Sequence, residues 1–174
     1  DNSVDFRNGL KRDAGQMSGN EQMAAVQRRI QVRETIRTHI QRERELYPRG
    51  IKVLSLVFID EVSKYRLYDG DNDDGRNGEY AKMFEEEYEN VVGQLQRQFG
   101  DDAYLHYLDG IDVHKTHQGY FSIDKKKGKK ARFVEGKIDR KTQLSDDVDA
   151  YDLIMKDKER LLSLDEPVRF IFSH

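Results

Sequence analysis

The chain has 174 residues, of which 36% are charged and 36% hydrophobic, and this length fits one domain with an added arm. It contains no cysteine, which excludes disulfides, thiolate metal sites and thiol catalysis. Its formal net charge of -3 gives no overall basic field for nucleic acid, so any such contact must be local. No apolar run is long enough to cross a membrane and no signal peptide opens the chain, so we expect a cytoplasmic protein without a membrane partner. Because the first residue is Asp1 rather than Met, we expect a processed chain or a piece cut from a longer one.

The first fifty residues predict an arm followed by a long helix. Residues 1–20 contain few apolar side chains and several glycines, which is typical of a loop or a flexible arm. Residues 21–46 contain neither Gly nor Pro, and their valines and isoleucines recur at roughly helical spacing. We therefore expect a long charged helix that ends near Pro48 and Gly50.

The segment "IKVLSLVFI", residues 51–59, is apolar nearly throughout and rich in branched side chains. A short continuous apolar run favours a strand that is covered on both faces, as in a parallel sheet. We therefore expect this strand to be buried.

The acidic run at residues 69–78 is a loop by composition, and its alternating aspartates suggest a calcium loop. The sixth position of that pattern is Asp74 instead of Gly, and the twelfth is Tyr80 instead of Glu. A solvated loop is therefore the better interpretation.

The segment after this loop predicts a core helix that ends at Gly100. Its apolar residues recur at helical spacing: Tyr80, Phe84, Tyr88, Val91, Leu95 and Phe99. Residues 103–109 and 110–123 are then expected to contain extended segments, the second including "THQGYFSI".

A hairpin insertion is expected over about residues 119–147. Phe121 and Ile123 alternate before a lysine run, and Ala131 and Phe133 alternate after it. The run would form the tip.

The end of the chain predicts one more helix and one more strand. The helix is indicated by Val148, Tyr151, Ile154, Met155, Leu161 and Leu162, and the strand by residues 168–172. From residue 51 onward the order is strand, helix, strand, hairpin, helix, strand. This alternation predicts an α/β fold whose first and last strands are buried neighbours in a parallel sheet with right-handed crossovers.

His106, His114 and His117 are close in sequence, which raises the possibility of a zinc site. In an extended strand His114 and His117 would face opposite ways, and no cysteine supports them. We interpret these residues as surface or core histidines.

Asp124 and the "EGK" segment, which contains Glu135 and Lys137, allow a second interpretation of the hairpin. An aspartate on one strand with Glu-x-Lys on the next is the pattern of Mg²⁺-dependent nucleases. The pattern arises easily by chance in so charged a chain, and a solvated hairpin is the alternative.

Two groups of cations are candidate phosphate contacts. Lys125, Lys126 and Lys127 begin the hairpin tip, where lysines either hold a nucleic-acid backbone or keep a solvated edge from aggregating. Lys64 and Arg66 follow the strand at 51–59, at the carboxyl end where open α/β sheets place ligands. An ordinary amphipathic turn is the alternative there.

Three long segments together resemble the restriction (Res) subunit of type III restriction-modification enzymes. They are "IKVLSLVFIDEVSKYR", "GYFSIDKKKGK" and "YDLIMKDKERLLSLDEPVRFIFSH", and the likeness is dense from Ile51 to His174 and weaker before it. Within them "VLSLVFID" is similar to helicase motif IV, "THQGYFS" to the short motif that follows, and "VRFIFSH" to the segment leading into motif V.

The resemblance implies that residues 21–174 are part of the second RecA-like domain of an ATP-dependent DNA motor and that residues 1–20 are an arm. The chain would be a fragment cut where motif V begins, with an incomplete domain. It would supply DNA-backbone contacts and half of the ATP cleft of the parent endonuclease. The phosphate loop, the acidic Mg²⁺ motif and the arginine-bearing motif VI are absent from it, as is the parent's nuclease domain.

These departures imply that the chain alone binds no cofactor and is inactive, whereas the parent uses ATP and Mg²⁺. The implied partners are DNA and the modification (methyltransferase) subunit. The implied DNA contacts are Lys64, Arg66, Ser122, Lys125, Lys126, Lys127 and Ser173. Two alternatives stay open: a small Mg²⁺ nuclease that uses Asp124, Glu135 and Lys137, and a non-catalytic interaction module that docks through its long helix.

Overall fold

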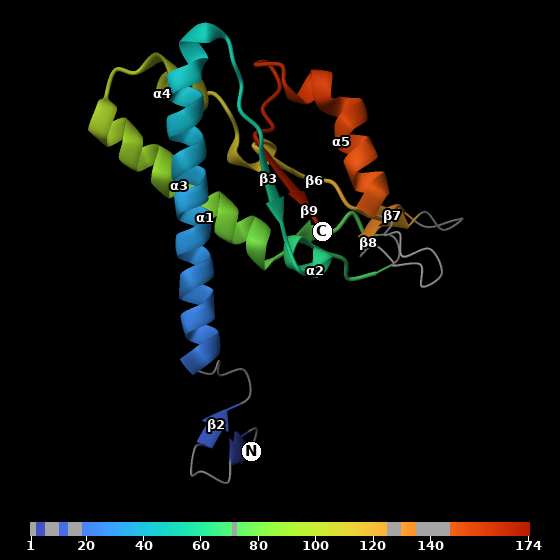
Figure 1. Ribbon diagram of the computed structural model, residues 1–174. Coiled ribbons are helices and arrows are strands. Elements are labelled where there is room, and N and C mark those ends of the chain that lie inside the picture. The colour runs from blue at the N-terminus through green and yellow to red at the C-terminus, as the bar shows by residue number, and fades with distance from the viewer. Residues whose placement is uncertain (1–2, 6–10, 14–18, 71–72, 125–129, 135–146) are drawn as a thin grey trace.

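A computed structural model describes residues 3–5, 11–13, 19–70, 73–124, 130–134 and 147–174 (Figure 1). At its centre is a parallel sheet of three strands in the order β3 (Ser55–Phe58), β9 (Phe170–Ser173) and β6 (His117–Gly119). Ser55 is in register with Phe170, and so is His117 on the other side. The prediction that the first and last strands of the α/β unit are parallel neighbours is confirmed.

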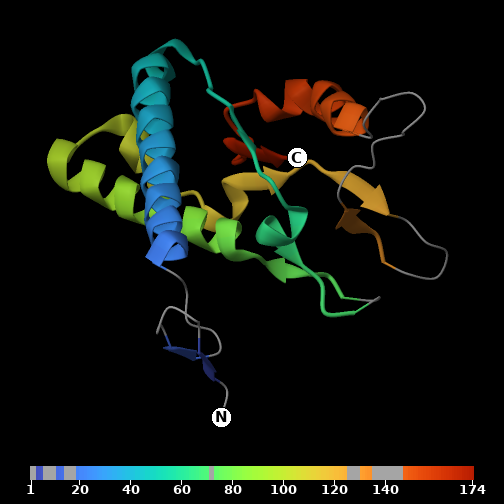
Figure 2. The ribbon, with the colours of Figure 1, turned by 60° about the horizontal axis from the view of Figure 1, so that its bottom comes forward.

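Helices cover both faces of the sheet (Figure 2). The long helices α1 (Gly19–Leu46) and α3 (Glu79–Phe99) pack on one face, and α5 (Asp147–Leu161) packs on the other. Successive side chains of β9 point to opposite faces of the sheet. Phe170 and Phe172 therefore enter the larger core, while Ile171 joins a smaller cluster with Leu161 of α5.

The predicted stripe of α3 forms much of the larger core. Its buried members are Tyr80, Phe84, Tyr88, Val91 and Leu95, whereas Phe99 at the helix end is 39% exposed. The long helix before it is also confirmed, but α1 contributes only Ile36 and Ile40 as fully buried apolar side chains.

Charged contacts attach the polar helix α1 to its neighbours. The buried carboxylate of Glu87 on α3 accepts hydrogen bonds from Arg29 at 2.9 Å and from Arg33 at 2.6 Å. Near the other end of α1, Glu43 pairs with Arg169, which precedes β9. These ion pairs fix α1 across α3 and beside the start of the last strand.

The prediction that β3 is buried on both faces is wrong. Its burial alternates, with Leu56 47% exposed and Phe58 70% exposed, while Val57 packs against the larger core. β3 is an edge strand among the described residues, and the cluster under α5 includes Leu54 but neither Leu56 nor Phe58. The apolar run therefore marks a strand covered on one face only.

Residues 103–109 are helical, which corrects the expectation of an extended segment. The helix α4 (Ala103–Asp109) begins at Asp102, whose Oδ1 accepts the backbone N–H groups of Tyr104 and Leu105 at 3.1 Å each. Tyr104, Leu105 and Leu108 are all buried, a spacing that belongs to one face of a helix.

The predicted hairpin is present. β7 (Ser122–Asp124) pairs antiparallel with β8 (Arg132–Val134), and Ile123 lies opposite Phe133. The lysines expected at its tip, residues 125–127, lie outside the described residues.

The remaining described elements are short. They are β1 (Ser3–Asp5) with β2 (Lys11–Asp13), which pair within the expected arm, η1 (Tyr47–Arg49), α2 (Val62–Tyr65), β4 (Arg66–Leu67) with β5 (Arg76–Asn77), and η2 (Val113–Lys115).

None of the described helices has the length and apolar character needed to cross a bilayer.

Candidate DNA-backbone interface at the carboxyl edge of the sheet

The segments that follow the three parallel strands meet at one edge of the sheet. His174 Nε2 donates to the carbonyl oxygen of Asp60 at 3.0 Å, which joins the ends of β9 and β3. Tyr120, directly after β6, donates its backbone N–H to Phe172 at 2.7 Å and accepts from Ser173 Oγ at 3.0 Å. This is the edge at which open α/β sheets bind ligands.

Lys64 and Arg66 both lie in the α2–β4 turn that follows β3, as predicted. Lys64 Nζ is 3.5 Å from Glu79 Oε2 in a half-exposed ion pair. The Arg66 guanidinium donates to Asn77 Oδ1 at 3.0 Å and to the carbonyl of Asp74 at 2.9 Å. Both cations are partly exposed, so each combines contacts within the chain with access to solvent.

The two predicted serines have different surroundings. Ser173 is 4% exposed and its hydroxyl donates to the Tyr120 carbonyl, so that hydroxyl is already used within the sheet edge. Ser122 is partly buried at the start of β7. The structure therefore places Lys64, Arg66 and Ser173 next to carboxyl ends of neighbouring strands, while Ser122 belongs to the hairpin.

The residues of the alternative nuclease site are not brought together by any described contact. Asp124 ends β7, but Glu135 and Lys137 lie outside the described residues, as do Lys125, Lys126 and Lys127. Within the described ranges there is no group of three or more His, Asp or Glu side chains that could hold a metal ion.

His114 and His117 converge, which corrects the expectation that they diverge. Oε1 of Glu85 lies 2.9 Å from His114 Nδ1 and 3.0 Å from His117 Nε2, and it also accepts from Asn77 at 2.6 Å. His114 belongs to the 3-10 turn η2 rather than to a strand, so the alternation rule does not apply to it. No sequence signal links Glu85 to histidines so distant in the chain.

The chemistry of this cluster follows from its burial. Because Nε2 of His117 donates to Glu85, its Nδ1 accepts from the Tyr65 hydroxyl at 2.9 Å. Burial lowers the pKa of His117, whereas the hydrogen bond to Glu85 raises the pKa of the exposed His114. The cluster therefore holds two imidazoles next to one carboxylate: His117 is neutral, and His114 can take up a proton. Arg66 lies close to His117.

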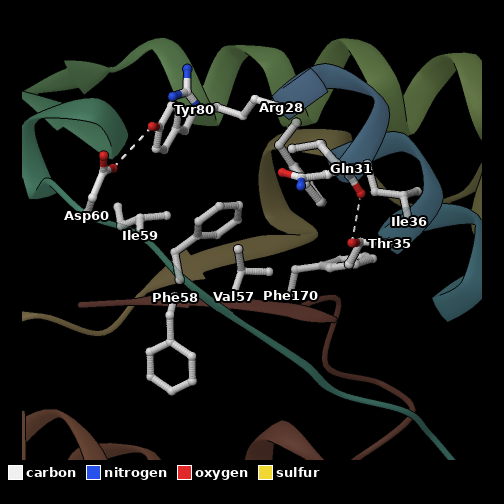
Figure 3. Close-up of a pocket in the computed structure, with 13 residues that line it drawn as sticks. Arg28, Gln31, Thr35, Ile36, Val57, Phe58, Ile59, Asp60, Tyr80 and Phe170 are labelled. Carbon is white, nitrogen blue, oxygen red and sulfur yellow. Dashed lines mark hydrogen bonds between the residues drawn. The ribbon is translucent and has the colours of Figure 1, made fainter. Parts of the chain in front are cut away.

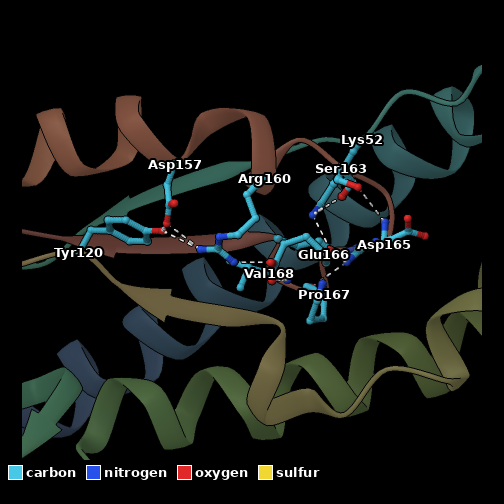
Figure 4. Close-up of polar contacts among 10 residues, drawn as sticks. Lys52, Tyr120, Asp157, Arg160, Ser163, Asp165, Glu166, Pro167 and Val168 are labelled. Carbon is cyan, nitrogen blue, oxygen red and sulfur yellow. Dashed lines mark hydrogen bonds and ion pairs between the residues drawn. The ribbon is translucent and has the colours of Figure 1, made fainter.

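A second polar cluster, shown in Figure 4, fixes the turn between α5 and β9. The Tyr120 hydroxyl donates to Asp157 at 2.8 Å, and Arg160 contacts Asp157 at 2.7 Å and also Glu166. The buried Lys52 donates to the carbonyls of Ser163 at 3.0 Å and Glu166 at 2.5 Å. These contacts set where β9 enters the sheet.

A cavity of about 350 Å³ lies beside the carboxyl end of β3, between α1 and α3 (Figure 3). Most of its lining is apolar, and polar side chains of Arg28, Gln31 and Asp60 stand at its margin. The sequence gives no signal for it, because its walls come from four separate segments.

Comparison with known proteins shows to which proteins the chain is similar. No protein-family model matches the sequence, and no solved structure matches the chain. The chain is 34% identical over 149 residues to the type III restriction-modification enzyme EcoPI Res subunit of Escherichia phage P1. It is 33% identical over 147 residues to the EcoP15I Res subunit of Escherichia coli.

Each match covers 82% of this chain but only 13% of the relative, so the chain spans about an eighth of the length of those subunits. The agreement over most of the chain confirms the resemblance drawn from the sequence motifs. The chain therefore belongs, over the matched segment, to the family of Res subunits of type III restriction-modification enzymes.

Proposed function

We propose that this chain forms part of the second RecA-like domain of the DNA motor in a type III restriction enzyme. Its role is to hold the phosphate backbone of DNA at the carboxyl edge of the parallel sheet. The proposal is supported by the similarity to Res subunits over 82% of the chain. It is also supported by the parallel pairing of β3 with β9, the two segments that resemble motif IV and the approach to motif V.

The observation that carries the proposal is the meeting of chain segments at that edge. The contacts of Asp60 with His174 and of Ser173 with Tyr120 bring the ends of all three strands together. Lys64 and Arg66 follow directly after the first of these ends. Two cations on a short turn suit phosphate oxygens, and a motor needs phosphate contacts in order to step along any sequence.

In this proposal the parent enzyme binds ATP and Mg²⁺ between this domain and another RecA-like domain. The additional partners are DNA and the modification subunit of the type III system. The hairpin β7–β8 adds a second backbone contact through Lys125, Lys126 and Lys127. Ser122 lies at the base of that hairpin, whereas the hydroxyl of Ser173 donates to Tyr120 and the backbone of Ser173 pairs with β3.

The test is binding of the 174-residue chain to labelled duplexes of two unrelated sequences, by fluorescence anisotropy over a range of salt concentrations. The proposal predicts the same affinity for both duplexes and a steep decrease as salt rises, because phosphate neutralisation releases counterions. A marked preference for one sequence, or binding that does not change with salt, would contradict a backbone-holding role.

A second candidate function is a docking module, and one observation favours it. Met23, Val26 and Ile30 are 63%, 57% and 50% exposed and recur at helical spacing on the half of α1 that extends away from the sheet (Figure 1). Such a stripe is typical of a helix that packs on a partner. Replacing the three by Gln and measuring mass by light scattering against concentration tests self-association through this stripe.

A further inference from the structure

We propose that the cavity between α1, β3 and α3 is a binding site for an unpaired nucleotide, with the base inside and the phosphate on Arg28. This inference rests on the proposed function in so far as the nucleotide comes from a DNA strand. The volume of about 350 Å³ lies at the lower end of the range of ligand sites, about 300–1,000 Å³, and suits a single nucleotide.

The walls of the cavity suit a flat ring. The floor of the cavity consists of buried aromatic side chains, Phe84 from α3 and Phe170 and Phe172 from β9, each 2% exposed or less, and the partly buried Val57 and Val32 lie beside them. Nucleobases have large apolar faces, so removing those faces from water against this apolar lining would favour binding.

The margin of the cavity supplies the polar groups that a nucleotide needs (Figure 3). The Tyr80 hydroxyl donates to Asp60 at 3.1 Å, and the Arg28 guanidinium lies 5.0 Å from the centre of the Tyr80 ring. Arg28 and Asp60 therefore stand on either side of one aromatic side chain, a cation next to a carboxylate at the same opening.

The guanidinium of Arg28 at this opening can bind a ligand. Within the described part of the chain, Arg28 contacts the Tyr80 ring but has no hydrogen-bonding partner for its guanidinium. A guanidinium presents several N–H donors and suits a phosphate, while the Asp60 carboxylate accepts from the exocyclic amine of adenine, cytosine or guanine. The carboxamide of Gln31, also at the margin, can donate or accept.

This pairing of groups distinguishes a nucleotide from simpler amphipathic ligands. A fatty or aromatic carboxylate would satisfy Arg28 and the apolar wall but has no donor for the Asp60 carboxylate, whereas the exocyclic amine of a nucleobase supplies one. An aromatic amino acid carries an amine and a carboxylate, so it is the chief competitor for the same chemistry.

The first experiment measures binding of deoxynucleoside monophosphates and of phenylalanine to the 174-residue chain by calorimetry. We expect dAMP or dCMP to bind more tightly than dTMP, which lacks an exocyclic amine. The variants Arg28→Gln and Asp60→Asn are expected to weaken binding roughly tenfold, the loss of about one charge-assisted hydrogen bond. Tighter binding of phenylalanine than of every nucleotide would overturn the proposal.

The second experiment separates a free nucleotide from a DNA strand as the source. A single-stranded oligonucleotide with one 2-aminopurine is compared with the same oligonucleotide in which that position is abasic, so that charge is equal. Occupancy by a base in a strand predicts quenched fluorescence and roughly tenfold tighter binding than the abasic strand. Binding of free nucleotides without either effect assigns the site to free nucleotides.

A variant that fills the cavity, Val57→Phe, provides the control for the site itself. It is expected to abolish nucleotide binding and base-dependent quenching while leaving salt-dependent duplex binding unchanged. Failure of duplex binding alone would refute the proposed function but leave the cavity intact as a nucleotide site. Absence of both mononucleotide binding and any base effect in the unmodified chain would refute the cavity proposal.

Discussion

Glu43 Oε2 lies 3.2 Å from Arg169 Nε and 3.1 Å from His39 Nε2, and all three side chains are fully buried. The same oxygen accepts from the Tyr104 hydroxyl at 2.9 Å. Burial alone would raise the pKa of Glu43, but the hydrogen bond from His39 and the charge of Arg169 outweigh it and hold that pKa below its usual value. The carboxylate is therefore charged and ties α1 to the start of β9.

Removing the ion pair between Glu43 and Arg169 should strongly destabilise the fold. Arg169→Met is expected to lower the free energy of unfolding by roughly 3–5 kcal/mol, because it leaves the Glu43 charge buried without its partner. The measurement is urea unfolding followed by circular dichroism. Arg42→Met is the control, since Arg42 is exposed and, among the described residues, forms an ion pair with exposed Glu45. A cost for Arg169→Met equal to that of the control would show that the pair contributes little.

Lys52 should make stability depend on alkaline pH. Burial and the nearby charge of Arg169 lower its pKa from 10.5 to about 8. Between these values the unfolded chain binds more protons than the folded chain, so this group's contribution to stability rises with pH. We expect the stability difference between the native chain and Lys52→Met to grow in favour of the native chain from pH 8 to pH 9.5. A difference that stays constant over that range would contradict the lowered pKa.

That pH range is chosen to avoid the buried tyrosines. Burial raises the pKa of Tyr120 to about 12, and it also raises those of Tyr65 and Tyr88. Above about pH 10 the unfolded chain loses tyrosine protons that the folded chain keeps, so stability falls there. Buffers at pH 9.5 or below keep this opposite trend small.

His114 should stabilise the fold only in mildly acidic solution. Its pKa is raised by Glu85, so its contribution is complete below its unfolded value of 6.5 and is lost as pH rises through the folded value. The pKa of Glu85 is lowered because the hydrogen bonds from both histidines outweigh its burial, so the pair also weakens as the carboxylate is protonated. We expect His114→Ala to cost less than about 1 kcal/mol at pH 5.5–6 and nothing measurable at pH 8.5. Equal costs at both pH values would rule out the charged pair.

The one-sided cover of β3 can be tested by two matched substitutions. Phe172→Ala in β9 is expected to cost roughly 3–5 kcal/mol, because Phe172 is 2% exposed in the larger core. Phe58→Ala in β3 is expected to change stability by no more than about 0.5 kcal/mol, because Phe58 is 70% exposed. Thermal unfolding of both variants checks this, and a large loss for Phe58→Ala would mean that its face is covered in solution.

Periodicity and composition predicted the elements that depend on local pattern. The stripe from Tyr80 to Leu95 is buried as predicted, and residues 168–172 lead into a buried strand beside β3. The error at β3 has a physical cause. An apolar run shows which side chains would gain from burial, but whether they are buried depends on elements that are distant in the sequence. The expectation of an extended segment at 103–109 is wrong because a short apolar pattern fits a strand as well as a helix, and the local signal for the helix is the cap at Asp102.

The candidate site was predictable only in part. Lys64 and Arg66 follow a predicted strand, so their place at a sheet edge follows from the fold class. The contact of Glu85 with His114 and His117 and the cavity beside Val57 arise from segments far apart in sequence. No local pattern encodes such contacts, because they depend on how α1 and α3 pack on the sheet.

The measurement that tests the DNA-backbone role most directly is the salt dependence of duplex binding by the Lys64→Ala, Arg66→Ala double variant. If both cations hold phosphates, the slope of log affinity against log salt should decrease by roughly 2, about 0.9 for each lost phosphate contact. The control is Lys156→Ala with Lys158→Ala, which removes the same charge from exposed positions on α5. A slope that stays the same in the first variant, or decreases equally in the control, would contradict phosphate binding by the turn after β3.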